Sequence, residues 1–244
     1  EFRRVLFRSG RSIAFLLAAE GASVAICARD EKAVTATVAE LEAKGARAFG
    51  AAFDVGKGED LRRFVADAAA ALGGIDCAVA NASALSEGSS EEEFRRAYDV
   101  DLMHTRNLAE ASLPHLALSG MGSFCAISSV SGSEDYGYGG VSYGTMKAAL
   151  FFYVKSFARH AAAKGVRANI VSPGTTYFQG GYWHEVEVKE PERFARNIAD
   201  NPLGRMATPE EIANAVVFLA STKASFISGV NLTVDGTLTV RIPN

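Results

Sequence analysis

The chain has 244 residues, 48% of them hydrophobic and 22% charged, and this ordinary globular composition excludes disordered, collagenous and coiled-coil proteins. Its net charge of −3 comes with no basic block after the first eleven residues, so the sequence carries no electrostatic signature of nucleic-acid binding. No apolar run approaches the roughly 20 residues that span a bilayer. We therefore expect a small molecule as partner, and neither nucleic acid nor a membrane.

From Gly10 onward the hydrophobic period alternates between helix and strand. The predicted elements are helix Ser12–Glu20, strand Ser23–Ala28, helix Lys32–Lys44, strand Ala46–Phe53, helix Glu59–Leu72, strand Ile75–Ala80, helix Glu91–Leu118, strand Ser123–Ser128, helix Val141–Lys164, strand Arg167–Val171, helix Pro209–Ser221 and strand Asn231–Val234. This alternation predicts an α/β fold with a doubly wound parallel sheet and helices on both faces. No linker or internal repeat interrupts it, so we expect a single domain over residues 10–244.

The first nine residues do not fit this pattern. A central parallel strand is buried on both faces and nearly continuously apolar, whereas arginines flank only three apolar residues at Val5–Phe7. A signal peptide would need a longer apolar segment and a cleavage site. Residues 1–9 are similar to the translation of sequencing-library adapter DNA. We therefore expect a non-native segment there, with the first strand and the phosphate loop truncated; a genuine basic N-terminal arm is the alternative.

The cysteines and histidines indicate no metal site. The three cysteines are odd in number, far apart and inside apolar runs, namely Cys27, Cys77 and Cys125. This spacing fits neither a disulfide framework nor a metal site, so we expect buried free thiols in a reducing cytoplasm. The four histidines also lack ligand spacing: His104, His115, His160 and His184.

Tyr143 and Lys147 place a phenol and an ammonium one turn apart on the same face of a predicted helix. A neighbouring cation favours the phenolate, which makes the tyrosine usable as a general acid or base. The preceding predicted strand ends in Ser128 and Ser129, and the carboxyl ends of parallel strands are where open α/β sheets bind ligands. This position favours a catalytic pair over an exposed amphipathic one.

These residues and several further motifs resemble the short-chain dehydrogenase/reductase family, and the resemblance extends from Gly10 to Thr237. The matching positions are Gly10 at the third glycine of the family's TGxxxGxG turn, Asp54-Val55 at its adenine-contacting pair, Asn81-Ala82 at its NNAG motif, Pro173-Gly174 at the turn after its sixth strand, and Asp235-Gly236 at its C-terminal DG. The resemblance implies a Rossmann-type fold and an enzyme that transfers hydride between a nicotinamide cofactor and a carbonyl or alcohol.

In the family, a tyrosine protonates the substrate carbonyl, a serine polarises its oxygen and a lysine holds the nicotinamide ribose. The resemblance assigns these roles to Tyr143, Ser129 and Lys147. Ser129 lies fourteen residues before Tyr143, one more than the family spacing leads us to expect. Ser128 and Ser131 therefore remain alternatives for the hydroxyl role.

Three positions depart from the family pattern. Asp101 stands where the family carries an asparagine that helps to hold a water chain leading to the lysine, and an ionised carboxylate accepts hydrogen bonds without donating them. We place Asp101 with the catalytic residues and expect water to link it to Lys147. Ser83 ends the weakened NNAG motif, and Thr237 stands where a second glycine is usual.

The end of the second predicted strand indicates the cofactor. An NAD enzyme places an acid there to accept hydrogen bonds from the ribose, but Ala28 and then Arg29 occupy these positions. A guanidinium suits a 2′-phosphate, so we expect NADP(H) to be preferred and NAD(H) to be possible. The alternative is an arginine that caps the next helix or is solvated. The cofactor-binding residues that the resemblance implies are Gly10, Arg29, Asp54, Val55, Asn81, Tyr143, Lys147, Pro173, Gly174 and Thr176.

The segment Thr175–Asn201 corresponds to the family's substrate lid. Aromatic residues gather in and before it: Tyr136, Tyr138, Tyr177, Phe178, Tyr182, Trp183 and His184. Aromatic walls suit an apolar or ring-bearing carbonyl compound, and packing of the lid against the body is the alternative. With five acids and three bases, residues 185–200 form a poor surface for an acidic acyl carrier protein.

The sequence thus predicts an NADP(H)-dependent carbonyl reductase or alcohol dehydrogenase. The alternative is a catalytically silent relative that serves as a binding or regulatory protein. The resemblance also implies a homotetramer or homodimer formed through two long helices.

Overall fold

The computed structural model describes residues 8–86, 88–136 and 140–241. The predicted strand candidate Val5–Phe7, nearly all of the segment expected to be non-native, and Tyr138 lie outside the described residues. The elements are α1 Arg8–Ala19, β1 Val24–Ala28, α2 Glu31–Ala43, β2 Ala48–Ala52, α3 Gly58–Leu72, β3 Cys77–Ala80, α4 Glu91–Ala97, α5 His104–Ser119, β4 Ser123–Ile127, α6 Val141–Ala162, β5 Arg167–Pro173, α7 Tyr182–Lys189, α8 Pro191–Asp200, α9 Pro209–Ala220 and β6 Asn231–Val234.

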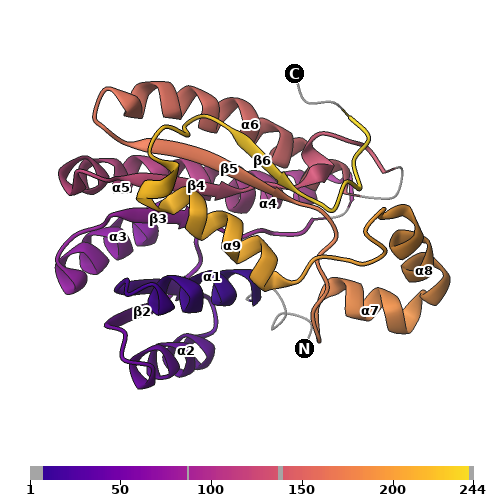
Figure 1. Ribbon diagram of the computed structural model, residues 1–244, viewed down its shortest axis with the longest axis horizontal. Helices are drawn as coiled ribbons and strands as arrows, with labels where there is room; N and C mark the ends of the chain where they lie inside the picture. The colour runs from indigo at the N-terminus through magenta and orange to yellow at the C-terminus, as the bar shows by residue number, and fades with distance from the viewer. Residues whose placement is uncertain (1–7, 87, 137–139, 242–244) are drawn as a thin grey trace.

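All strand pairs in the described chain are parallel, in the orders β1-β2 and β3-β4-β5-β6. β4 is buried along its whole length, and its side chains alternate between two cores. Phe124 packs with residues of α3, α5 and α6, whereas Cys125 packs with residues of α1 and α9. Figure 1 shows α1 and α9 packed together, with α6 beyond the strands. The expected α/β sheet with helices on both faces is confirmed.

The predicted element boundaries agree with the structure within a few residues, with two exceptions. The helix expected over Glu91–Leu118 is interrupted by a π-helical segment, Tyr98–Met103. Such a segment widens one turn and is frequent at functional sites. The expected lid also contains the short helices α7 and α8, which the sequence analysis did not predict. α8 begins at Pro191, whose fixed φ suits a first helical turn.

Thr237 occupies the backbone conformation in which the family pattern has glycine. Its φ is 63°, a left-handed value that β-branched residues rarely adopt. The preceding carboxylate holds the turn: Asp235 Oδ1 accepts from the Thr237 amide at 3.0 Å, and Asp235 Oδ2 accepts from the Thr239 amide at 2.9 Å. The side chain of Asp235 therefore fastens this strained turn beyond β6.

Three further findings concern the sequence expectations. Cys27, Cys77 and Cys125 are free cysteines, but only Cys125 is fully buried and the other two are half-buried. Within the described ranges, no cluster of histidine, cysteine and acidic side chains is arranged to hold a metal ion. None of the helices in these ranges combines the length and apolar character needed to cross a membrane.

Candidate active site

The predicted site residues follow the carboxyl ends of four parallel strands. Arg29 follows β1, Asn81 follows β3, Ser129 lies two residues after β4, and Gly174 follows β5. The carboxyl ends of parallel strands meet at one edge of a sheet, which is where open α/β folds bind ligands. The sequence positions expected to be functional therefore gather at the ligand-binding edge.

Lys147 lies at the centre of the residues that are expected to be catalytic. Its side chain is only 3% exposed, and Nζ donates to the carbonyl oxygen of Ile127 at 3.0 Å. Nζ also lies 3.1 Å from Asp101 Oδ1 and 5.4 Å from the centre of the Tyr143 ring. α6 presents Tyr143 and Lys147 one turn apart, so the ammonium and the phenol ring lie close together as the sequence predicts.

Asp101 contacts the lysine directly. The expected water link is wrong, because the 3.1 Å separation is that of an ion pair, and the Asp101 side chain is fully buried. The π-helical segment Tyr98–Met103 carries this carboxylate, and Asp101 Oδ2 accepts from the Ala84 amide at 3.2 Å. A buried ion pair is costly to break, because removal of one partner leaves an uncompensated charge.

The serines after β4 have different partners. Ser128 Oγ donates to the carbonyl oxygen of Lys147 at 2.8 Å, so this hydroxyl fastens α6 to the end of β4. Ser129 Oγ accepts from the Ser131 amide at 3.1 Å, and its own O–H remains a donor. These contacts favour Ser129 over Ser128 for the hydroxyl role.

Two glycines that the sequence analysis did not single out bring this turn against α6. A Cβ at Gly144 would lie 2.8 Å from the Ser131 carbonyl oxygen. A Cβ at Gly132 would lie 2.7 Å from the carbonyl carbon of Lys147. Both contacts are too short for any side chain, so only glycine allows the serine turn to lie against the helix that carries Tyr143. The sequence signal was present, because Gly144 lies inside the Tyr143-to-Lys147 motif.

The expected cofactor residues also lie close together. Gly10 is the third residue of α1, and a Cβ there would lie 2.8 Å from Asn81 Nδ2. A Cβ at Gly174 would meet the Asp235 side chain at 2.7 Å. Thr176 Oγ1 donates to the Gly174 carbonyl oxygen at 3.3 Å. The close approach of the Asp235 backbone explains why position 174 carries glycine, whereas Gly10 meets the end of the Asn81 side chain.

The residues that are expected to contact the adenosine end of a cofactor line a cavity. Asp54 Oδ1 accepts from the Gly56 amide at 3.0 Å, and the neighbouring Val55 is buried. Arg29 is exposed, and the residue that caps α2 is Asp30, which accepts from the Ala33 amide at 3.1 Å. The alternative in which Arg29 caps that helix is therefore wrong. A cavity of about 1170 Å³ is lined by Arg29, Asp54, Val55, Gly10 and Asn81, among other residues.

The lid aromatics mostly contact one another. Tyr177 stacks edge-on against His184 and Phe194, with centroid separations of 6.4 and 5.8 Å. The Arg193 guanidinium lies 5.6 Å from the Tyr182 ring centre and 5.8 Å from that of Trp183. Packing within α7 and α8 thus accounts for several residues that the sequence analysis considered as substrate walls.

His104 is a buried neighbour of the ion pair. The ring is 3% exposed, and Nδ1 lies 3.0 Å from the Val100 carbonyl oxygen. Burial lowers the pKa of the His104 imidazole from 6.5 to about 4, and the Lys147 charge acts in the same direction. The ring is therefore uncharged at neutral pH and adds no charge near the ion pair.

This pKa predicts acid sensitivity. Because the folded protein binds the His104 proton less readily than the unfolded chain, the neutral ring stabilises the fold above pH 6.5, and this stability is lost as pH falls to about 4. The loss amounts to about 3 kcal/mol by the usual conversion of pKa differences. His104→Gln should flatten this part of the curve of unfolding free energy against pH. His160→Gln, at an exposed position on α6, is the control and should leave the curve unchanged.

The comparisons with known proteins agree with this geometry. A family model described as enoyl-(acyl carrier protein) reductase matches residues 9–239. Isoepoxydon dehydrogenase of Penicillium expansum is 37% identical over 223 residues, covering 89% of this chain and 85% of the relative. 4-Formylbenzenesulfonate dehydrogenase of Comamonas testosteroni is 37% identical over 235 residues, covering 93% and 92%.

Solved structures show the same fold. A 7-alpha-hydroxysteroid dehydrogenase in complex with NADH and 7-oxo glycochenodeoxycholic acid is similar with a TM-score of 0.88 and 28% identity, covering 96% of this chain and 91% of that one. An NADPH-bound short chain oxidoreductase from Pseudomonas aeruginosa PAO1, which contains an atypical catalytic center, has a TM-score of 0.88 and 27% identity, covering 96% and 93%. The fold and the site define a Rossmann-like oxidoreductase. The chain belongs to the short-chain dehydrogenase/reductase family.

Proposed function

We propose that this oxidoreductase interconverts a carbonyl compound and an alcohol with NADP(H), and that Tyr143 is its general acid and base. The observation that carries the proposal is the buried cluster beside the end of β4, where Lys147 Nζ lies 5.4 Å from the Tyr143 ring and 3.1 Å from Asp101. The NADH and NADPH in the two solved neighbours support a nicotinamide cofactor.

The test is NADPH consumption with a panel of ketones and aldehydes. We expect at least one compound for which the rate of NADPH oxidation saturates with increasing concentration. If the protein binds NADPH but reduces none of the compounds, the alternative of a catalytically silent binding protein is favoured.

Residues of this chain fit such a cofactor. Gly10 in the first turn of α1 leaves space beside Asn81, and a helix N-terminus suits phosphate groups. When bound, the cofactor supplies the hydride for the reaction. Tyr143 donates its phenolic proton to the substrate oxygen, and Ser129 donates a hydrogen bond to the same oxygen. These donors stabilise the charge that develops on that oxygen.

Lys147 orients the cofactor and supports the phenol. An ammonium has three donors; Nζ donates one to the Ile127 carbonyl oxygen and forms an ion pair with Asp101 Oδ1, which accepts no hydrogen bond from the described part of the chain. Donors therefore remain for a ribose hydroxyl, which is the role that the family resemblance assigns to this lysine. Asp101 acts through Lys147, and so we assign it as a positioning residue.

Arg29 should select NADPH over NADH. Its exposed guanidinium follows Ala28 at the end of β1 and lines the cavity, where it can pair with a 2′-phosphate. Arg29→Ala should narrow the difference in binding free energy between the two cofactors by about 1.5 to 3 kcal/mol. Fluorescence titration with each cofactor measures this difference. Arg63→Ala, an exposed arginine of α3, is the control. Equal affinities in the unmutated protein would contradict the assignment.

We further infer an apolar or ring-bearing substrate and a homo-oligomer. Tyr136 and Trp183 are half-buried, and Trp183 also packs against Tyr182 and Arg193; we assign these two side chains to the substrate wall. Two apolar side chains on the long helices support self-association: Leu118 of α5 is 87% exposed and Phe152 of α6 is 82% exposed. Large exposed apolar side chains are typical of contact surfaces when they gather on one face.

A further inference from the structure

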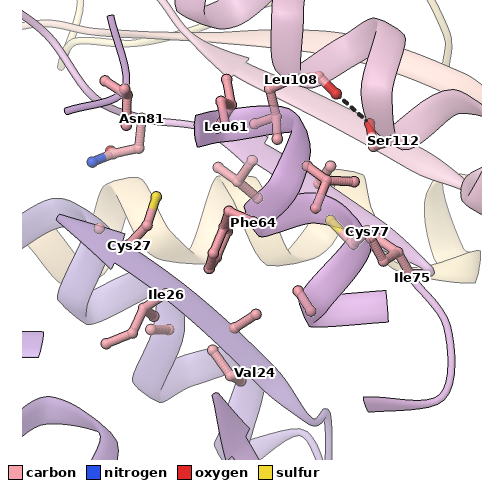
Figure 2. Close-up of a pocket in the computed structure, with 18 of the residues that line it drawn as sticks. Val24, Ile26, Cys27, Leu61, Phe64, Ile75, Cys77, Asn81, Leu108 and Ser112 are labelled. Atoms are coloured by element: carbon pink, nitrogen blue, oxygen red, sulfur yellow. Dashed lines mark hydrogen bonds between the residues drawn. The ribbon is translucent and has the colours of Figure 1, made fainter. Parts of the chain in front are cut away.

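The loop after β3 is bonded to the buried ion pair of the candidate active site. Asn81 begins this loop, and its side chain lies at the cavity (Figure 2). The residues that follow, 83–86 together with Gly88, form a short segment that we call the strap. The Ala84 amide donates to Asp101 Oδ2 at 3.2 Å. One end of the strap is therefore fixed to the carboxylate of the ion pair.

The strap is also fastened to the first turn of α6. Ser142, the residue before Tyr143, is fully buried, and its Oγ donates to the Ser86 carbonyl oxygen at 3.1 Å. The Ser142 amide donates to the Gly88 carbonyl oxygen at 3.2 Å. Both hydrogen bonds join one residue of the helix to the strap. Ser142 therefore fixes the place at which the turn that carries the phenol begins.

These two hydrogen bonds replace an ordinary helix cap. The first amides of a helix have no acceptor within the helix, and the side chain of the N-cap residue usually accepts from one of them. Gly140 is the N-cap residue of α6, and no side chain caps the helix there. The carbonyl oxygen of Gly88 in the strap accepts from the Ser142 amide instead. The position of the first turn of α6 thus depends on the strap.

The backbone of the strap is strained. Leu85 has a φ of 45°, in the left-handed region that leucine rarely adopts. Its amide donates to Ser83 Oγ at 3.2 Å, and the bonded residues Ala84 and Ser86 flank it on both sides. Strained backbone persists where the surrounding structure over-determines it, and it is frequent at active sites. The strap is therefore held in one conformation between the ion pair and α6.

We propose that Ser142 is a positioning residue, and that its bonds to the strap hold the Tyr143 phenol at a fixed distance from the Lys147 ammonium. This inference rests on the proposed function, in which Tyr143 is the general acid and base. The centre of the phenol ring lies 5.4 Å from Lys147 Nζ. An ammonium stabilises a phenolate more strongly the nearer it lies. A first turn that is released from the strap moves more freely, so this stabilisation weakens.

Ser142→Ala tests this role, because it removes the hydroxyl and keeps the amide. We expect the turnover number to fall by about tenfold, while the KM and the NADPH affinity stay within about twofold of the parent values. The rising limb of the pH profile for alcohol oxidation should move to higher pH by about 0.5 unit, because the phenolate is less well stabilised. A merely structural role would lower stability and leave this limb in place.

Ser123→Ala is the matched control. Ser123 is as fully buried as Ser142, and its Oγ donates to the Leu219 carbonyl oxygen at 3.2 Å from the first residue of β4. Each variant removes one hydroxyl-to-carbonyl hydrogen bond, so both should lower the midpoint of denaturant unfolding to a similar extent. Only Ser142→Ala should change turnover. A turnover number and a pH profile that match those of Ser123→Ala would overturn the positioning role.

A second measurement needs no substrate. The ultraviolet absorbance of tyrosinate, taken as the difference between each protein and the same protein with Tyr143→Phe, follows the phenolate of Tyr143. We expect this absorbance to appear at higher pH in Ser142→Ala than in the parent, and at the parent pH in Ser123→Ala. An unchanged curve in Ser142→Ala would overturn the inference. A shifted curve in a protein that reduces no carbonyl compound would support the positioning role and contradict only the proposed reaction.

Discussion

Tyr143→Phe should lower the turnover number for carbonyl reduction by about 10³-fold, within the range of general acid–base catalysis, and leave NADPH affinity unchanged. The phenol is the group that can donate a proton from the face of α6 that also carries Lys147. Phenylalanine keeps the ring and its packing over the ammonium and removes only the hydroxyl. Steady-state kinetics and fluorescence titration separate turnover from cofactor binding.

The control for this variant lies on the same helix. Tyr153 is half-buried on α6, and its hydroxyl donates to the Arg106 carbonyl oxygen at 3.4 Å, away from the ion pair. Tyr153→Phe should therefore leave turnover within about twofold of the parent value. If Tyr143→Phe retained a tenth or more of the parent rate, the general acid would be a different group. If it also lost NADPH binding, the residue would have a structural role.

Asp101→Asn should destabilise the protein and shift its pH profile. The amide leaves the buried Lys147 ammonium without its counter-charge, which should cost about 3 kcal/mol of unfolding free energy. An ionised carboxylate beside the ammonium also opposes formation of the Tyr143 phenolate. The oxidation reaction needs that phenolate, so the rising limb of its pH profile should move to lower pH in Asp101→Asn. His104 is uncharged at neutral pH and does not offset the change.

Two measurements test this variant separately. Denaturant unfolding measures the free energy of unfolding. The pH dependence of the alcohol oxidation rate measures the position of the rising limb. Asp99→Asn is the matched control, because Asp99 lies exposed in the same π-helical segment and should change neither quantity. A pH profile superimposable on that of the parent would show that the Asp101 carboxylate is uncoupled from the catalytic pair.

The order of helices and strands was predictable because short, mostly apolar strands such as β4 alternate with longer helices. The grouping of Tyr143 and Lys147 was predictable for a similar reason, since helical spacing alone places them on one face. The sequence analysis identified Asp101 as a departure from the family pattern, but it did not predict the direct contact between Asp101 and Lys147. That contact depends on the π-helical segment, and a hydrophobic period does not reveal one widened turn.

The lid shows a second limit of the sequence. The 8 residues of α7 show little helical periodicity, whereas the 10 residues of α8 are clearly amphipathic and carry a signal that the sequence analysis missed. The contacts of Arg193 with Tyr182 and Trp183 join residues of both helices, and residue types alone do not indicate which aromatic side chains pack within the lid.

The most direct test of the proposed reaction is deuteride transfer. The protein is incubated with NADPH carrying deuterium at the transferable position and with a panel of ring-bearing ketones and aldehydes, and the products are analysed by mass spectrometry. The account predicts an alcohol that carries one deuterium on its carbinol carbon, formed by the parent and by Tyr153→Phe but absent with Tyr143→Phe. An absence of deuterated alcohol across the panel, in a protein that binds NADPH, would contradict the account and identify a catalytically silent relative.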